Sequence, residues 1–156
     1  AMAELVLAHV GKSKRIADLF CGSGTFALRL ARVGKVHAVE AEDKPLKALD
    51  FAARNTQGLK PVSVEKRDLF RRPLMTSELK NYDAVVFDPP RAGAEFQCKE
   101  LARSTVKKIV AVSCNPLTLA RDLAILTEGG YRITRVTPVD QFLWSPHVEA
   151  VATLEK

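Results

Sequence analysis

The stretch Asp18-Leu19-Phe20-Cys21-Gly22-Ser23-Gly24-Thr25-Phe26-Ala27 predicts a strand that enters a glycine turn, followed by a helix. Gly22 and Gly24 let the backbone turn tightly and approach a ligand closely. Glu40 follows Gly22 by 18 positions and ends the next apolar run, where a carboxylate can hydrogen-bond the hydroxyls of a ribose. This pattern predicts a nucleoside cofactor, and it fits a dinucleotide as well as S-adenosylmethionine. The alternative is a tight turn that only begins a helix.

Strand-like apolar runs alternate with helix-like segments along the chain. We expect strands at 15–20, 35–40, 62–66, 82–87, 107–113, 131–138 and 148–154, and helices at 25–33, 44–55, 95–104 and 117–128. Such alternation indicates a mostly parallel sheet covered on both faces. The last two strands leave no room for a helix between them, so they should pair as an antiparallel hairpin. The prediction is an α/β fold with a mostly parallel seven-stranded sheet, the layout of a Rossmann-like methyltransferase.

Length and composition favour one globular domain over residues 1–156, since 47% of the residues are hydrophobic and 27% are charged. No apolar run approaches the length of a membrane span, and no signal peptide opens the sequence. Three unevenly spaced cysteines predict neither a disulfide framework nor a metal site, and a reducing cytoplasm is the simplest setting. The net charge of +6 fits a nucleic-acid partner and, equally well, a solvated basic surface.

Cys114 stands in Val112-Ser113-Cys114-Asn115-Pro116, at the end of an apolar strand and just before a helix. Pro116 suits the first helical position. Ligands of α/β folds bind at this edge of the sheet, and the positive end of a helix favours a reactive thiolate. The alternative is a buried, inert thiol, which is what we expect of Cys21 and Cys98.

Three acids and one arginine also mark this edge of the predicted sheet. Asp88 and Arg91 belong to Phe87-Asp88-Pro89-Pro90-Arg91-Ala92-Gly93, where two prolines stiffen a loop that can hold a planar base. Asp68 follows the third strand, and Glu149 opens the last one. Each has an ordinary structural alternative: a rigid turn around the prolines, a helix cap for Asp68, and a salt bridge for Glu149.

The motifs Asp-Leu-Phe-Cys-Gly-x-Gly-x-Phe, Asp-Pro-Pro-Arg-x-Gly, Ser-Cys-Asn-Pro-x-Thr-x-Ala-Arg-Asp-Leu and His-Val-Glu occur here in that order. The series resembles the catalytic domain of the RNA uracil-5 methyltransferases, which depend on S-adenosylmethionine and make 5-methyluridine. The resemblance implies that Cys114 is the nucleophile and that Glu149 is the base. It also implies which residues bind the cofactor and the target base. For the cofactor we expect Asp18, Phe20, Gly22, Gly24, Glu40, Asp68 and Asp88, and for the base Asp88 and Arg91.

The chemistry of such an enzyme accounts for these residue types. A thiolate that adds to C6 of uracil makes C5 nucleophilic, and a carboxylate then removes the C5 proton after methylation. No metal is needed, and the target base has to leave its stack. We expect an RNA partner, either ribosomal or transfer RNA, and a cytoplasmic monomer without membrane or protein partners.

Some features depart from the family or admit other functions. Family members carry further domains upstream, some with an iron–sulfur cluster, so we expect this chain to be an excised catalytic domain. The stretch 141–145 also differs from the form expected before His-Val-Glu. Alternatives are an enzyme that methylates an amino group of a base, a dinucleotide-dependent dehydrogenase, and a fragment that recruits RNA without catalysis. The first two need no Cys114.

Overall fold

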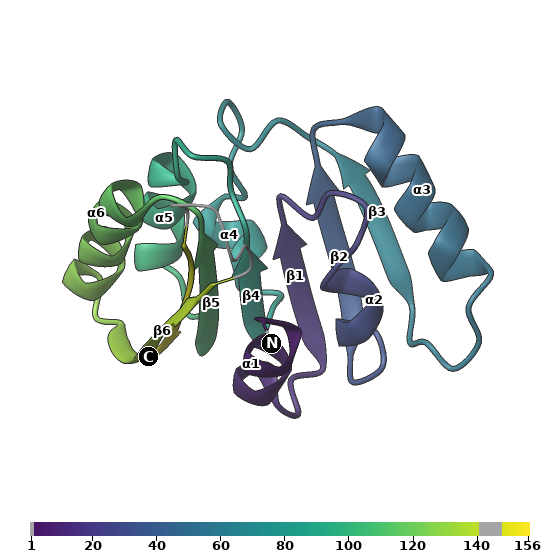
Figure 1. Cartoon of the computed structure of the whole chain (residues 1–156), viewed down its shortest axis with the longest axis horizontal. Helices are drawn as coiled ribbons and strands as arrows, with labels where there is room; N and C mark the ends of the chain where they lie inside the picture. The colour runs from purple at the N-terminus through teal and green to yellow at the C-terminus, as the bar shows by residue number, and fades with distance from the viewer. Residues whose placement is uncertain (1, 141–147) are drawn as a thin grey trace.

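The molecule is built on one seven-stranded sheet, seen face-on in Figure 1. The structure, a computed structural model, describes residues 2–140 and 148–156. The strand order is β3-β2-β1-β4-β5-β7-β6. The strands are β1 (Arg15–Leu19), β2 (Lys35–Glu40), β3 (Val62–Lys66), β4 (Ala84–Phe87), β5 (Lys108–Ser113), β6 (Arg132–Val139) and β7 (Glu149–Glu155).

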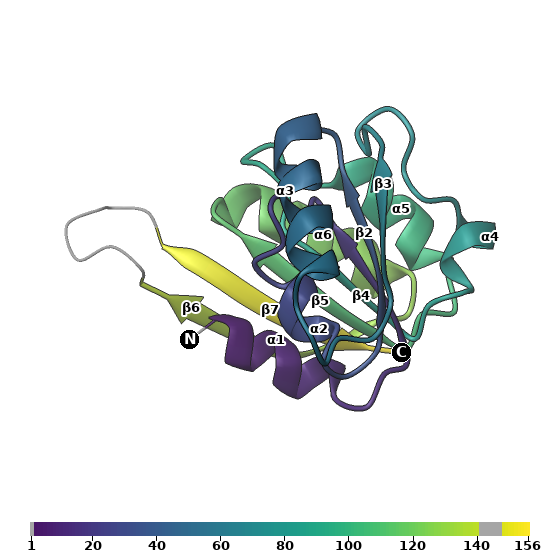
Figure 2. The ribbon, with the colours of Figure 1, turned by 90° about the vertical axis from the view of Figure 1, so that its right-hand side faces the viewer.

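The first five strands are parallel, and β7 pairs antiparallel with both β5 and β6, which confirms the predicted fold class. β7 pairs with β6 as predicted, and it also inserts between β6 and β5. Its antiparallel direction brings its first residue, Glu149, to the edge where β5 ends. Figure 2 shows β6 and β7 as a long ribbon that extends beyond the other strands.

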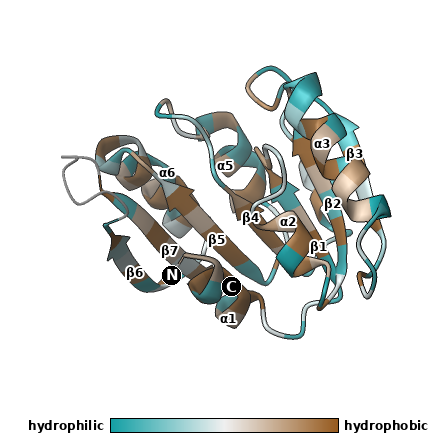
Figure 3. Ribbon diagram, turned by 45° about the vertical axis from the view of Figure 1, so that its right-hand side comes forward, coloured by the Kyte–Doolittle hydropathy of each residue, from teal (hydrophilic) through white to brown (hydrophobic). Residues whose placement is uncertain are grey.

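Helices cover both faces of the sheet. α1 (Met2–Val10), α2 (Ala27–Leu30) and α3 (Asp43–Arg54) contribute to one hydrophobic core, and α4 (Thr76–Leu79), α5 (Glu95–Ala102) and α6 (Pro116–Glu128) to the other. In β4, Ala84 and Val86 belong to the first core while Val85 and Phe87 belong to the second. Central strands buried on both faces need continuous apolar runs, which Figure 3 shows along the middle of the sheet.

Several predicted boundaries differ from those observed. β1 ends at Leu19, one residue early, because Phe20 takes a left-handed conformation with φ of 57°. α2 spans only Ala27–Leu30 instead of the expected 25–33. The sequence prediction omitted two helices, α1 and the single turn of α4. α1 buries Ala3, Val6 and Val10, a spacing typical of an amphipathic helix.

Candidate active site

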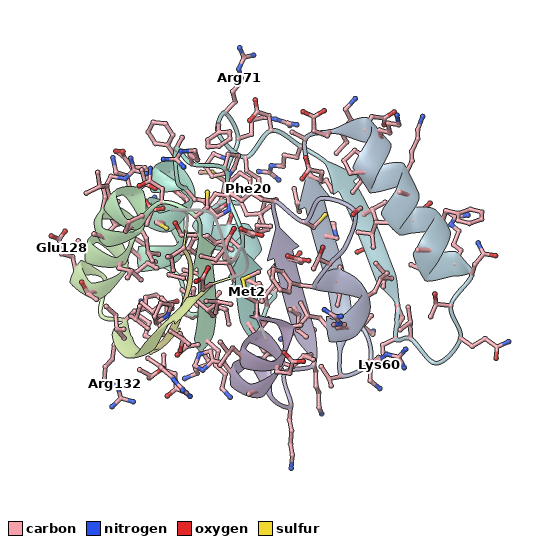
Figure 4. The ribbon with its side chains drawn as sticks, viewed as in Figure 1. Met2, Phe20, Lys60, Arg71, Glu128 and Arg132 are labelled. Atoms are coloured by element: carbon pink, nitrogen blue, oxygen red, sulfur yellow. The ribbon has the colours of Figure 1, made fainter. Side chains whose placement is uncertain are left out.

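A hollow of about 360 Å³ lies at the carboxyl edge of the parallel strands. Four of the predicted site residues line it: Phe20 after β1, Glu40 at the end of β2, Asp68 after β3 and Asp88 after β4. Figure 4 shows Phe20 at the carboxyl end of β1. The edge of the sheet thus brings together residues that lie far apart in the sequence, as expected for an open α/β sheet.

Glu40 holds the glycine turn in place. Its Oε1 accepts a hydrogen bond of 2.9 Å from the N–H of Gly22, and its Oε2 accepts one of 2.8 Å from the N–H of Glu42. Gly22 has a φ of 56°, and a Cβ at this position would meet nothing within 4 Å. The turn therefore leaves open space beside Gly22, where a ligand can approach the backbone.

Gly24 serves a different purpose. Its φ is 97°, and a Cβ at this position would collide with the side chain of Leu49 on α3. Gly24 is thus required for the packing of α3 against the turn, whether or not a ligand also approaches it. A substitution such as Gly24→Val therefore disturbs the fold, and weaker ligand binding in that variant would not report on the site alone.

Asp18, which the resemblance assigns to the cofactor, is not among the residues that line the hollow. Its side chain is fully buried at the end of β1, and neither carboxylate oxygen has a hydrogen-bond partner among the described residues. Burial is the main cause that raises the pKa of Asp18 well above its usual range, and the charges of Asp88 and Glu40 raise it further, while the nearby Ala27 N–H opposes them. An unpartnered buried carboxyl group is costly, which marks this position as one that can receive a ligand's donor or cation.

Two aromatic rings form a wall of the hollow. The rings of Phe20 and Phe70 lie 5.4 Å apart, tilted by 54°. Asp68 Oδ1 accepts a hydrogen bond of 3.0 Å from the N–H of Phe70, so Asp68 both lines the hollow and orders this turn. The helix cap expected as the alternative for Asp68 is not formed, because a turn and not a helix follows it, and Oδ2 lies 4.0 Å from Nε of Arg71.

Arg67 fixes the segment that carries this wall, and the sequence analysis did not single it out. Its Nε donates to the carbonyl of Arg72 at 2.6 Å, and its Nη2 donates to the carbonyl of Pro73 at 2.8 Å. The same guanidinium forms a fork with Glu78, at 3.0 and 3.1 Å, and contacts Glu65 at 3.3 Å. These donors close the chain 67–73 into a loop over the hollow. The only sequence signal was an arginine next to Asp68.

The predicted nucleophile and the predicted base lie at the same edge of the sheet. Ser113 on β5 pairs with Ala150 on β7, where the pairing of these two strands ends, so Cys114 and Glu149 are the next residue of each segment at this edge. Cys114 is partly exposed. Burial, and then the charge of Glu149, raises the pKa of Asp88 to about 6.

The other two cysteines behave as the sequence predicted. Cys21 and Cys98 are buried. Burial is the main cause that raises the pKa of each thiol well above its usual range, and nearby aspartates add to it. Both thiols therefore stay protonated and unreactive at neutral pH.

The first turns of α6 hold the loop of residues 88–94, called the proline loop, through hydrogen bonds. The side chain of Asn115 caps the helix by accepting from the N–H of Leu117 at 3.0 Å, and it donates to the carbonyl of Arg91 at 3.0 Å. Thr118 Oγ1 donates to the same carbonyl at 2.9 Å. The buried Asp122 accepts from the N–H of Ala94 at 2.7 Å. These polar residues belong to the Ser-Cys-Asn-Pro motif, and their role is to hold the loop that carries Asp88 and Arg91.

Gly93 allows this close approach between the loop and α6. Its φ is 77°, and a Cβ there would lie 2.6 Å from Arg121 Nη2 and 2.9 Å from both Asp122 Oδ2 and Thr118 Cβ. Packing against α6, the helix that follows Cys114, thus explains why the last position of the Asp-Pro-Pro-Arg-x-Gly motif is glycine.

Some residues that the sequence analysis singled out are not part of the arrangement described so far. The stretch 141–145 and His147 lie outside the described residues. Arg91 is exposed at the rim, and its carbonyl, not its guanidinium, makes the contacts described above. Within residues 2–140 and 148–156, no group of three or more His, Cys, Asp or Glu side chains could hold a metal ion. In the same ranges, no helix has the length and apolar character needed to span a membrane.

Known proteins resemble this chain over nearly its whole length. It is 96% identical over 156 residues to a protein of Agrobacterium fabrum named an uncharacterized RNA methyltransferase, and it covers 38% of that protein. It is 40% identical over 148 residues to the 23S rRNA (uracil(1939)-C(5))-methyltransferase of Hahella chejuensis, covering 90% of this chain and 33% of that protein. The chain thus spans well under half the length of these relatives.

A solved structure shares both fold and sequence with it. The tRNA (uracil-54, C5)-methyltransferase of Pyrococcus abyssi, in complex with S-adenosyl-L-homocysteine, superposes with a TM-score of 0.82 at 31% identity. The match covers 98% of this chain and 37% of that protein. The family model described as tRNA (Uracil-5-)-methyltransferase matches residues 2–156. Because that match covers almost the entire sequence, the chain belongs to the tRNA (uracil-5-)-methyltransferase family.

Proposed function

We propose that this chain transfers a methyl group from S-adenosylmethionine to C5 of a uridine in RNA, through a covalent bond between Cys114 and C6 of the base. The observation that carries the proposal is the pairing of β5 with β7, which ends at Ser113 and Ala150 and so brings Cys114 and Glu149 to one edge, near the loop of Asp88. A thiol and a carboxylate on either side of one position suit addition followed by proton removal.

The hollow beside this pair fits the cofactor. S-adenosylmethionine carries a sulfonium and an ammonium, and Asp18, Glu40 and Asp88 are acids at the same edge. Asp18 has no hydrogen-bond partner in the described chain, so it can accept from the ammonium. Glu40 and Asp68 both line the hollow, and we expect Glu40 to accept from the ribose hydroxyls and Asp68 from the adenine amino group. When bound there, the cofactor supplies a methyl group on a positively charged sulfur.

The chain's own residues carry the remaining steps. The Cys114 thiolate adds to C6, and the electrons of the C5–C6 double bond move toward the C4 carbonyl, which makes C5 nucleophilic. Asp88 accepts a hydrogen bond from the N3–H of uracil. Once C5 bears the methyl group, Glu149 takes the C5 proton. The electrons of that C–H bond restore the double bond, and Cys114 leaves as a thiolate.

RNA is the proposed partner, since the net charge of +6 suits a polyanion. The relatives named above act on 23S rRNA and on tRNA, so both classes of RNA belong in the test. The base must be turned out of its stack to reach Cys114.

Trapping with 5-fluorouridine tests the nucleophile. Fluorine at C5 cannot leave as the proton does, so the complete protein should form a stable adduct with such RNA. Peptide mapping should find the adduct on Cys114, and Cys98→Ala should leave it unchanged as a matched control. An adduct on Cys21, or one that survives in Cys114→Ala, would contradict the assignment.

Glu149→Gln tests the base. Addition and methylation should proceed in this variant, but elimination should slow by roughly 100-fold or more, the usual contribution of a general base. A methylated covalent complex with ordinary uridine RNA should then accumulate on denaturing gels. Normal turnover would make Glu149 a structural acid and would move the search for the base elsewhere.

A further inference from the structure

Leu117 is a large apolar side chain that is held rigidly and left exposed. Its exposed fraction is 81%, the highest among the large hydrophobic residues in the described part of the chain. It follows Cys114 by three residues and stands in the first turn of α6, within about 5 Å of rise from the nucleophile's end of the helix. An apolar side chain in this position does nothing for the core of the fold.

The backbone that presents Leu117 cannot easily move it out of the way. Pro116 begins the helix, and the cap from Asn115 fixes the N–H of Leu117 at 3.0 Å. Asn115 and the neighbouring Thr118 are both tied to the carbonyl of Arg91. The backbone that carries the Leu117 side chain is therefore rigid. It lies beside the exposed Arg91, whose guanidinium can bind a phosphate.

We propose that Leu117 enters the RNA stack in the place that the target uridine leaves. The inference rests on the proposed function and deepens it. A base that reaches Cys114 is still joined to its backbone, so the gap in the stack lies within one nucleotide of the nucleophile. An apolar wedge inserted there offsets part of the lost stacking, as proteins that unstack nucleic acids do with Leu, Ile, Met or Phe.

Other exposed apolar residues near this edge are less suited to the role. The ring of Phe70 packs on Phe20 in the wall of the hollow, 5.4 Å away. Phe96 lies on α5 under the ammonium of Lys99, at 5.5 Å. Leu117 is the one of these three that directly follows the Ser-Cys-Asn-Pro turn, so its position relative to a base on Cys114 is set by the shortest and stiffest connection.

The experiment compares Leu117→Ala with the unaltered complete protein on two RNAs of equal sequence around the target. In one RNA the 5-fluorouridine is stacked in a stem, and in the other a mismatch has already unstacked it. We expect adduct formation on the stacked RNA to slow by about tenfold, equivalent to ~1.4 kcal/mol, and to be nearly unchanged on the unstacked RNA. Leu117→Met should retain most of the rate, since it keeps an apolar side chain of similar volume.

Phe51→Ala provides the matched control, because Phe51 is 69% exposed on α3, away from the nucleophile. It should change neither rate. An unchanged rate for Leu117→Ala on the stacked RNA would overturn the wedge, and so would an equal slowing on both RNAs, which would indicate a role in the chemistry. If the unaltered protein forms no adduct with either RNA, the proposed function fails and the wedge fails with it.

Discussion

Replacing Arg67 by methionine should loosen the wall of the proposed cofactor site. The guanidinium is only 10% exposed and donates to the carbonyls of Arg72 and Pro73, at 2.6 and 2.8 Å. Such charge-assisted bonds contribute about 1.5–3 kcal/mol each when one partner is removed. Glu78 is 43% exposed, so its ion pair adds no more than ~1 kcal/mol. Because the freed loop can expose its carbonyls to water, we expect a net destabilisation of about 3 kcal/mol.

Two measurements test this expected destabilisation. Urea unfolding of Arg67→Met should show the lower stability, and calorimetry should show weaker binding of S-adenosylmethionine, since the loop carries Asp68 and Phe70. Arg67→Lys is the matched control: it keeps the charge but cannot form the fork and both carbonyl bonds at once, so it should fall between the two. Unchanged stability and unchanged affinity in Arg67→Met would refute the reasoning.

The pH dependence of this effect provides a second check. The hydrogen bond from Arg67 is the largest of the causes that lower the pKa of Glu78 below its ordinary value of 4.5, followed by that from the Met75 N–H. A lowered carboxyl pKa stabilises the fold above about 4.5, and this contribution is lost as the pH falls through the folded value. The stability difference between the unaltered protein and Arg67→Met should therefore shrink below about pH 4.5. A difference that stays constant would remove Glu78 from the account.

Two further substitutions probe the proline loop and the acids beside it. Gly93→Ala should destabilise the protein by about 2 kcal/mol, from the left-handed backbone and the contact with Asp122, and should lower the Tm in a thermal melt; a wild-type Tm would contradict the packing argument. Asp88→Asn should raise the free energy of unfolding at pH 8 while it reduces methylation. Because the raised pKa of Asp88 makes its stabilising contribution present at low pH and lost as the pH rises through about 6, this gain should vanish in urea melts near pH 4, and equal gains at both pH values would argue against it.

The strands could be predicted because the central ones are buried on both faces and so require continuous apolar runs. Their number and the hairpin at the end followed from spacing alone. The insertion of β7 between β5 and β6 did not, because hairpin pairing leaves open which of its two strands meets β5. That insertion is what brings Glu149 to the edge where Cys114 follows β5, so the sequence pattern could not predict that the two residues share this edge.

The candidate site likewise contains residues that could be predicted from the sequence and residues that could not. Residues that terminate strands, such as Glu40 and Asp88, were predictable because parallel strands end at one edge. The roles of Arg67, Thr118 and Asp122 depend on side-chain direction and on loops that fold back, and a one-dimensional pattern carries neither. The packing of Gly24 against Leu49 depends on the position of α3, which the sequence does not show, and the approach of a ligand to Gly24 stays a prediction.

Four acids from neighbouring strands lie at this edge of the sheet. Glu40, Asp18, Asp88 and Glu149 come from β2, β1, the loop after β4, and β7. Burial is the main cause that raises the pKa of Asp18 and of Asp88; the charges of Asp88 and Glu40 add to it for Asp18, and the charge of Glu149 adds to it for Asp88. In a chain with a net charge of +6, this edge gathers four acids, and the raised pKa values of Asp18 and Asp88 favour their protonated forms. A cation bound there relieves both the repulsion and the missing partner of Asp18. The same buried acids thus cost stability in the free protein and favour the binding of a positively charged cofactor.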